Sequence, residues 1–227
     1  MKCLFQIANS ELYSYSFAPI DSKMYIWLSD TQVMVIDPAI NDEAMELLNK
    51  SNVEELIVIL THEHYDHISG VNWLRKSFKC TVMAIEECAN NLGNPKKNAS
   101  AHFTTLLSFS SQQIREQVIH VEPFICQADE IFQEPFYLEW GRHRIEIIKT
   151  PGHSEGSICL IVDNKYVFTG DSLIKDKPII TRLPGGSKKQ YEEITYPFLK
   201  SLSSNMIIFP GHGEAGYLHE FKYLSKD

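Results

Sequence analysis

The most informative stretch of this sequence lies at residues 61–67 and reads Thr61-His62-Glu63-His64-Tyr65-Asp66-His67. Four of its side chains, those of His62, His64, Asp66 and His67, are of types that bind divalent metal ions. The stretch follows the continuous apolar run Leu56–Leu60, which is typical of a strand buried on both faces. In extended backbone, residues i and i+2 point to the same side, so His62 and His64 can bind one ion together. Asp66 and His67 are adjacent, point elsewhere and stand at the expected start of a helix, which favours a second ion.

Two ligands per ion are too few for a metal site, so further ligands are expected from other parts of the chain. Glycine lets the backbone turn sharply and approach an ion closely. Three turn segments qualify, because each follows an apolar strand and carries a Gly beside a His or an Asp: Thr150-Pro151-Gly152-His153, Thr169-Gly170-Asp171-Ser172 and Pro210-Gly211-His212-Gly213.

The motifs HxHxDH, PGH, GD and PGHG occur in this order between residues 62 and 213 and resemble those of the metallo-β-lactamase superfamily of hydrolases. Within that superfamily the chain is most similar to the glyoxalase II-like, thioester-cleaving group, which it also resembles in VIDPA at Val35–Ala39 and LPGGS at Leu183–Ser187. The resemblance implies an α/β (α+β) fold, a four-layer αββα sandwich with the metals at one edge of the two sheets. We expect one such domain over residues 1–227.

The same resemblance implies the ligands of two divalent ions. By it, the first ion is held by His62, His64 and His153, the second by Asp66, His67 and His212, and Asp171 bridges both. Zinc is the first expectation for the ions, with iron or manganese as alternatives. A hydroxide shared by the ions would attack a carbonyl group, and Asp66 is the expected catalytic residue that orients it or moves a proton.

Three further side chains lie near these motifs. Asp37 follows a strand and either caps a turn or orients a ligand imidazole from behind. Glu63 and Tyr65 alternate with the ligand histidines, so they are expected to point away from the metals and to pack or face solvent. The sequence assigns no substrate-binding residue.

Each half of the chain shows strands, then a helix, then a strand, which suits two sheets packed face to face with helices outside. Residues 86–130 are weakly patterned and long for a connection. We expect this segment to form a lid whose apolar floor consists of Phe103, Leu106, Leu107 and Phe109. Periodicity predicts helices at about residues 41–50, 69–78 and 187–202 and a last strand at Met206–Phe209.

Composition and charge exclude several classes. The 227 residues are 44% hydrophobic and 22% charged, and 21 basic against 29 acidic residues give a net charge of −8. No phosphate-neutralising surface is therefore expected, and nucleic acid is excluded as a partner. No apolar stretch approaches the ~20 residues that span a bilayer, and the N-terminus lacks the apolar region of a signal peptide. Five cysteines without CxxC spacing indicate reduced thiols, so we expect a cytoplasmic protein without membrane contact.

The leading prediction is a dinuclear hydrolase of a small-molecule acyl thioester or related ester, free or attached to a carrier. The alternatives are a lactonase acting on a lactone such as an acyl-homoserine lactone, and a non-catalytic partner-binding module. True metallo-β-lactamases generally lack the bridging Asp, so Asp171 argues against antibiotic hydrolysis. Only 15 residues follow His212 (227 − 212), which is short for the glutathione-binding helical region of glyoxalase II. Several basic residues after Asp171 are expected either to meet an anionic thiol carrier or to form a solvated surface: Lys175, Lys177, Arg182, Lys188 and Lys189.

Overall fold

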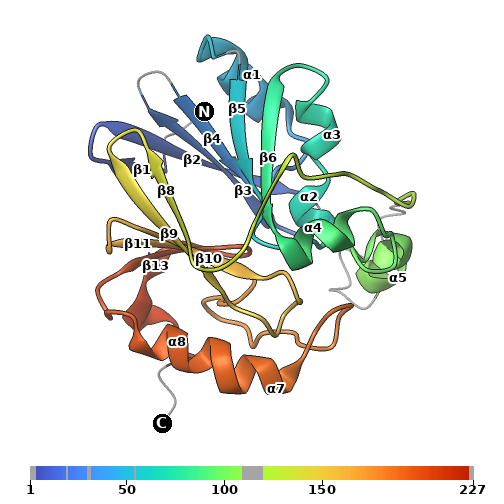
Figure 1. The fold of residues 1–227 in the computed structure, drawn as a ribbon, viewed down its shortest axis with the longest axis vertical. Coiled ribbons are helices and arrows are strands. Elements are labelled where there is room, and N and C mark those ends of the chain that lie inside the picture. The colour runs from blue at the N-terminus through green and yellow to red at the C-terminus, as the bar shows by residue number, and fades with distance from the viewer. Residues whose placement is uncertain (1–3, 19, 30–31, 54, 109–119, 225–227) are drawn as a thin grey trace.

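The computed structural model describes residues 4–18, 20–29, 32–53, 55–108 and 120–224. The chain forms two β-sheets that pack face to face, with helices on their outer sides (Figure 1). The four-layer αββα sandwich expected from the sequence is therefore confirmed. The first sheet contains, in spatial order, β1 (Phe5–Ile7), β2 (Ser10–Phe17), β3 (Ser22–Ser29), β4 (Gln32–Ile36), β5 (Glu55–Ile59), β6 (Lys79–Ile85) and β7 (Glu130–Phe132). The second contains, in spatial order, β13 (Gly216–Tyr217), β12 (Ile207–Pro210), β11 (Tyr166–Gly170), β10 (Ile158–Val162), β9 (His143–Lys149) and β8 (Phe136–Trp140).

The helices are short and connect these strands. In Figure 1, α1 and α3 lie beside the first sheet, whereas α7 and α8 lie below the second. The α-helices are α1 (Asp42–Lys50), α2 (Tyr65–Ile68), α3 (Val71–Leu74), α4 (Glu86–Leu92), α5 (Phe103–Ser108), α7 (Lys188–Gln190) and α8 (Tyr196–Ser201). Shorter turns are the 3-10 segments Ser100–His102 and Leu218–Glu220 and the π-helical segment Tyr191–Thr195.

Two apolar cores hold the layers together. The larger core lies between the sheets and contains Trp27 and Trp140, whose ring centroids are 4.4 Å apart. Strand β10 contributes to both cores, because Leu160 belongs to the inter-sheet core while its neighbour Ile161 packs with Leu199 of α8 in the second core. A strand with helices on one side and a sheet on the other is thus apolar at every position.

The structure confirms the first and third predicted helices. Helix α1 begins after Asn41, whose Oδ1 accepts a hydrogen bond from the Ala44 amide at 3.0 Å. A second helical run begins after Ser187, whose hydroxyl accepts a hydrogen bond from the Gln190 amide at 3.3 Å, and it continues through the π-helical segment into α8.

The single helix predicted at residues 69–78 is wrong. The chain instead forms α2 and α3, which are interrupted at Gly70. The Gly70 amide donates a hydrogen bond to the Pro38 carbonyl at 2.8 Å, and a Cβ at this position would overlap the backbone of Pro38 and Ala39. This close approach to the loop after β4 separates the two helices.

Residues 86–130 contain more regular structure than their weak periodicity indicated. The described part includes α4, a 3-10 turn and α5, and it ends at the edge strand β7. Residues 109–119, which include Phe109, lie outside the described residues, and the role of the segment as a lid stays a prediction. The described cysteines are all free thiols. No helix in the described part of the chain is long and apolar enough to cross a membrane.

Candidate metal centre

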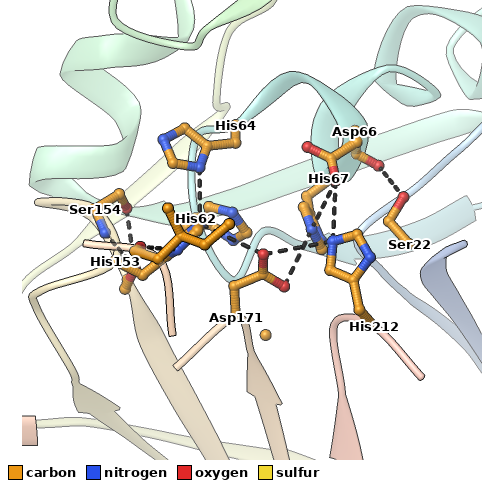
Figure 2. Close-up of polar contacts among 12 residues, drawn as sticks. Ser22, His62, His64, Asp66, His67, His153, Ser154, Asp171 and His212 are labelled. Carbon is orange, nitrogen blue, oxygen red and sulfur yellow. Dashed lines mark hydrogen bonds and ion pairs between the residues drawn. The ribbon is translucent and has the colours of Figure 1, made fainter. Parts of the chain in front are cut away.

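The predicted ligands meet at one edge of the sandwich. Residues 60–67 follow β5, which is flanked by the parallel strands β4 and β6. The turns that carry His153, Asp171 and His212 follow β9, β11 and β12 of the second sheet. Strands β11 and β12 are parallel, so Asp171 and His212 leave the same edge. Figure 2 shows the side chains of both sheets gathered on either side of Asp171.

The first group consists of His62, His64 and His153, whose ligand atoms lie within 4.8 Å of one another. All three residues are buried. The nitrogen of each ring that faces away from the group has its own partner, which fixes the ring orientation: His62 Nδ1 contacts Thr61 Oγ1 at 3.1 Å, His64 Nε2 contacts the Pro184 carbonyl at 3.0 Å, and His153 Nδ1 contacts the Ile180 carbonyl at 2.8 Å. The remaining nitrogens point toward one another, and His64 Nδ1 lies 2.9 Å from His153 Nε2.

The second group consists of Asp66, His67 and His212, which also lie within 4.8 Å of one another. Asp66 Oδ2 lies 3.2 Å from Nε2 of His67 and 3.2 Å from Nε2 of His212. The far side of each imidazole again has a partner. His67 Nδ1 donates to Asp37 Oδ2 at 2.9 Å, and His212 Nδ1 donates to the Ile20 carbonyl at 3.1 Å.

Asp171 lies between the two groups. Its Oδ2 is 3.4 Å from Nε2 of His153 in the first group and 3.4 Å from Nε2 of His212 in the second. Its Oδ1 is 3.4 Å from Nε2 of His67. One carboxylate therefore reaches ligands of both groups, as a bridging ligand must.

The donor set fits divalent ions because it leaves buried polar atoms without partners. His62 Nε2, His67 Nε2 and Asp171 Oδ1 are buried and make no hydrogen bond to any described residue. Such orphaned atoms are costly in a folded protein, and all three face the interior of the cluster. Imidazole nitrogens and carboxylate oxygens are the donors that zinc and related ions prefer.

The protonation of the cluster follows its mixture of imidazoles and carboxylates. Burial lowers the pKa of His153 to about 4 and that of His62 well below its usual range, so these rings are neutral, as metal ligation requires. Burial opposes the charging of His212, but the carboxylates of Asp171 and Asp66 raise its pKa to about 10 when no ion is bound, so an ion at the second position would replace that proton. Burial likewise opposes ionisation of Asp171, yet the neighbouring histidines hold the pKa of its carboxyl well below the usual value.

Two glycines allow the ligand loops to come this close. Gly170 has φ of +47°, and a Cβ there would overlap the side chain of Thr61. A Cβ at Gly211 would overlap Asp171 and the ring of His67. The glycines noted in the ligand motifs are therefore required by sterics at these two positions.

Asp37 makes contacts that match both interpretations of its sequence position. It is buried after β4, and its Oδ1 accepts a hydrogen bond from the Thr61 amide at 2.7 Å. Its Oδ2 accepts hydrogen bonds from the Thr61 hydroxyl at 2.6 Å and from His67 Nδ1 at 2.9 Å. Asp37, His62 and His67 also form a cluster of possible ligand atoms. Because both Asp37 oxygens already bind Thr61, we assign Asp37 to holding the loop and the His67 ring.

Glu63 and Tyr65 point away from the ligands and pack, and the solvent-exposed alternative for Glu63 is wrong. Glu63 is fully buried. Its Oε2 accepts a hydrogen bond from the Ser154 hydroxyl at 2.8 Å, and its Oε1 accepts one from Asn91 Nδ2 at 3.1 Å. The Tyr65 ring packs edge-on against Phe103 of α5 with centroids 4.9 Å apart. These two residues therefore join the ligand loop to the neighbour of His153 and to the segment at 86–130.

A cavity of about 710 Å³ opens beside the cluster. Its lining includes five of the seven predicted ligands, namely His64, Asp66, His153, Asp171 and His212. Much of the remaining lining is apolar and includes three of the four side chains expected as the floor of the lid, Phe103, Leu106 and Leu107. The metal cluster is thus open to a ligand on one side, and that side is largely apolar.

Sequence reasoning named Asp37 but missed the backbone carbonyls that fix other ligand rings from behind. The carbonyls of Ile20, Ile180 and Pro184 have no signature in a sequence, because every residue has a carbonyl group. Ser154 was also missed; it directly follows His153, and its hydroxyl donates a hydrogen bond to the buried carboxylate of Glu63. Its position beside a ligand was the only available signal.

Comparison with known proteins agrees with this geometry. The family model described as Metallo-beta-lactamase superfamily matches residues 22–212. The probable metallo-hydrolase YqgX of Bacillus subtilis is 26% identical over 197 residues, which cover 86% of this chain and 86% of that protein. A hydroxyacylglutathione hydrolase of Glaesserella parasuis is 25% identical over 157 residues, which cover 68% of this chain and 52% of that protein.

Two solved structures share the fold. The BLEG-1 B3 metallo-beta-lactamase superposes with a TM-score of 0.77 and 23% identity, and the match covers 95% of this chain and 100% of that one. TTHA1623, solved in a di-iron-bound form, superposes with a TM-score of 0.70 and 20% identity over 92% of this chain and 96% of that one. At these identities the likeness establishes the architecture and leaves the substrate open.

Proposed function

The chain belongs to the metallo-beta-lactamase superfamily, and we propose that it is a dinuclear metal-dependent hydrolase that cleaves an acyl thioester or a related ester. The observation that carries this proposal is the meeting of seven imidazole and carboxylate side chains, of which three keep a buried polar atom without a hydrogen bond to any described residue. A purely structural role would leave His62 Nε2 buried without any partner among the described residues, and nothing would compensate that desolvation cost. A pair of divalent ions removes it.

In this proposal His62, His64 and His153 hold one ion, Asp66, His67 and His212 hold the other, and Asp171 binds both. Zinc is the first candidate, with iron or manganese as alternatives. When bound, such ions act as Lewis acids on a carbonyl oxygen and lower the pKa of water to about 7. The chain's own part is to keep the ligands fixed, which the carbonyls and carboxylate behind the rings accomplish.

We assign to Asp66 the role of orienting the water molecule that acts as the nucleophile. Asp66 lines the cavity, so a water molecule that enters can reach it. Burial would raise the pKa of Asp66, but the charges of His67 and His212 hold it well below its usual range. An ionised carboxylate accepts hydrogen bonds from water, so Asp66 is suited to orient the attacking water.

The cavity favours a substrate whose leaving group needs no proton. Outside the metal ligands, the titratable side chains among the described lining residues are those of Lys177 and Arg182. Neither is a carboxylic acid or an imidazole that would protonate an amide nitrogen near neutral pH. A thiolate leaves without protonation, so a thioester suits this lining better than an amide. The likeness to a hydroxyacylglutathione hydrolase supports the same class.

The proposal is tested with protein of measured metal content on a substrate panel. The panel contains acyl thioesters of small thiols, of glutathione and of coenzyme A, together with acyl-homoserine lactones and a chromogenic β-lactam. We expect thioester turnover to be the highest and to fall at least ~10³-fold in His153→Ala, by analogy with the loss of one key electrostatic group in other hydrolases. His219→Ala is the matched control, because His219 is an exposed histidine whose ring contacts the Ser204 carbonyl away from the cluster.

The panel also separates the alternatives. Lactone turnover that exceeds thioester turnover tenfold would favour the lactonase, which the large apolar cavity also accommodates. A protein with two bound ions that hydrolyses no member above the rate of His153→Ala would instead favour a partner-binding module.

A further inference from the structure

Two basic side chains of the cavity lining have no counter-charge among the described residues. Lys177 and Arg182 lie in the segment after β11 and line the cavity beside the metal ligands. Neither makes a hydrogen bond or an ion pair with any described residue, whereas Lys175 pairs with Glu220 and Lys188 pairs with Glu192. Of the five basic residues noted in this region, these two are therefore the ones that face the site without a partner.

Apart from these two cations and the metal ligands, the described cavity lining is apolar. The same segment contributes Ile174, Ile180 and Leu183 to the cavity, and α5 contributes Leu106 and Leu107. The carboxylates in the lining are those of Asp66 and Asp171, and both are engaged with histidines of the cluster. An anion that enters the cavity thus meets two available positive charges, in a protein whose net charge is −8.

Helix α5 contributes only apolar side chains to the cavity, whereas both cations come from the segment after β11. Phe103, Leu106 and Leu107 belong to α5, whereas Lys177 and Arg182 belong to the segment that follows Asp171. The acyl chain and the thiol of a thioester extend in different directions from the carbonyl carbon. With that carbon at the metal ligands, a substrate can place an apolar part against α5 and an anionic part against the segment after β11.

We propose that Lys177 and Arg182 form a specificity site for an anionic group, a carboxylate or a phosphate, on the thiol portion of the substrate. This inference rests on the proposed function, because it takes the metal-bound end of the substrate to be a thioester. The substrate class it defines is an acyl thioester of an anionic thiol. Arg182 can bind either anion through two parallel hydrogen bonds, and Lys177 adds a point charge.

The test compares three thioesters that carry the same acyl chain on thiols of similar size. The thiols are mercaptopropionate, mercaptoethyl phosphate and the neutral mercaptopropionamide. The variants are Lys177→Gln, Arg182→Gln and the double variant, and the control is Lys188→Gln, which removes an exposed lysine outside the cavity lining. Both target residues are exposed and unpaired in the described structure, so the variants are expected to fold normally.

We expect the wild type to prefer at least one anionic thioester over the neutral one, and the two anionic thiols distinguish a carboxylate from a phosphate site. Each single variant should raise KM for that substrate about threefold to fivefold, and the double variant about tenfold or more, as is typical of exposed ion pairs. The value of kcat should stay within about twofold, since an anionic group that takes no part in the bond change contributes equally to binding of the ground state and the transition state. KM for the neutral thioester should not change, and added salt should weaken only the anionic preference.

Other results overturn the inference. Equal KM values for anionic and neutral thioesters in the wild type, or an equal effect of Lys188→Gln, would mean that no anion site exists. If metal-loaded wild type hydrolyses none of the thioesters, the proposed function fails. Calorimetric binding of the uncleavable thioether analogues then still tests the anion site. Weaker binding of an anionic analogue to the double variant than to the wild type and to Lys188→Gln would support the anion site. Equal binding of that analogue to all three proteins would refute it.

Discussion

Asp37 is the residue for which the structure gives the sharpest prediction, because three hydrogen bonds end on its two oxygens. In Asp37→Ala the Thr61 amide and His67 Nδ1 lose their acceptors in a fully buried place. The Thr61 hydroxyl keeps its contact with His62 Nδ1, 3.1 Å away. Two orphaned groups cost about 1–3 kcal/mol each, or about 2–6 kcal/mol in total. Removal of a buried carboxyl whose pKa burial raises offsets part of this, so we expect a loss of about 2–3 kcal/mol.

Asp37→Asn separates the two roles of the side chain. Asn tolerates the φ of +53° at this position, and its amide oxygen can still accept the Thr61 amide. Its NH₂ group replaces Oδ2, so His67 Nδ1 loses its acceptor, whereas the Thr61 hydroxyl, which donated to Oδ2, can accept a hydrogen bond from the new amide. We expect the free energy of unfolding to fall by only about 1 kcal/mol, whereas affinity at the second metal position should fall about 10- to 100-fold.

Urea unfolding in the presence of a chelator measures the stability of both variants, and competition with a chromogenic chelator measures their metal affinity. Asp37→Ala should lose stability and metal affinity together, whereas Asp37→Asn should lose mainly metal affinity. The reasoning is refuted if Asp37→Asn binds metal as tightly as the wild type. Asp37 would then serve only to cap the loop at Thr61.

Three further predictions follow from the site. Elemental analysis of the wild type should find close to two divalent ions per chain. Asp171→Ala should lower the occupancy of both metal positions. If this variant kept the metal content of the wild type, Asp171 would not bridge the two ions. Glu63→Leu leaves Ser154 and Asn91 without their buried partner and should lower the free energy of unfolding by about 2–4 kcal/mol. In Glu63→Gln the amide oxygen can accept from Asn91 and the NH₂ group can donate to the Ser154 hydroxyl, so this variant should lose less than half as much. Equal losses in the two variants would contradict this prediction. Catalytic efficiency on acyl thioesters should rise over the first few methylenes added to the acyl chain, with up to ~0.8 kcal/mol of transition-state stabilisation from each one. Leu106→Ala should flatten this dependence on chain length. A flat profile in the wild type would exclude an acyl site at α5.

The ligand motifs could be predicted from the sequence alone because metal ligands and tight turns have local signatures. Four ligands lie within residues 62–67, and the others stand beside glycines at the ends of apolar strands. The resemblance of these motifs to a known superfamily then supplied the sandwich, which the structure bears out. Short-range patterns of this kind survive in a sequence because each depends on a few adjacent residues.

The features that could not be predicted depend on contacts between distant segments. The break at Gly70 exists because the backbone of Pro38 lies against it, and the helical pattern of residues 69–78 contains no sign of that contact. The burial of Glu63 likewise depends on Ser154, which is 91 positions away. The π-helical turn at Tyr191–Thr195 lies where the Thr195 hydroxyl donates to the Pro151 carbonyl at 2.6 Å, next to the glycine before His153.

The packing of the two sheets is itself part of the metal centre. Each group of ligands combines residues from the loop after β5 with one histidine from the second sheet. Near the site the sheets are joined directly, since the Lys23 amide donates to the Gly211 carbonyl at 2.7 Å and the Tyr25 hydroxyl donates to the Pro210 carbonyl at 2.7 Å. A functional metal site must hold its ligands to within about 0.5 Å. Any shift between the sheets would therefore disturb both groups at once, and the inter-sheet core around Trp27 and Trp140 fixes the ligand geometry although it contains none of the ligands.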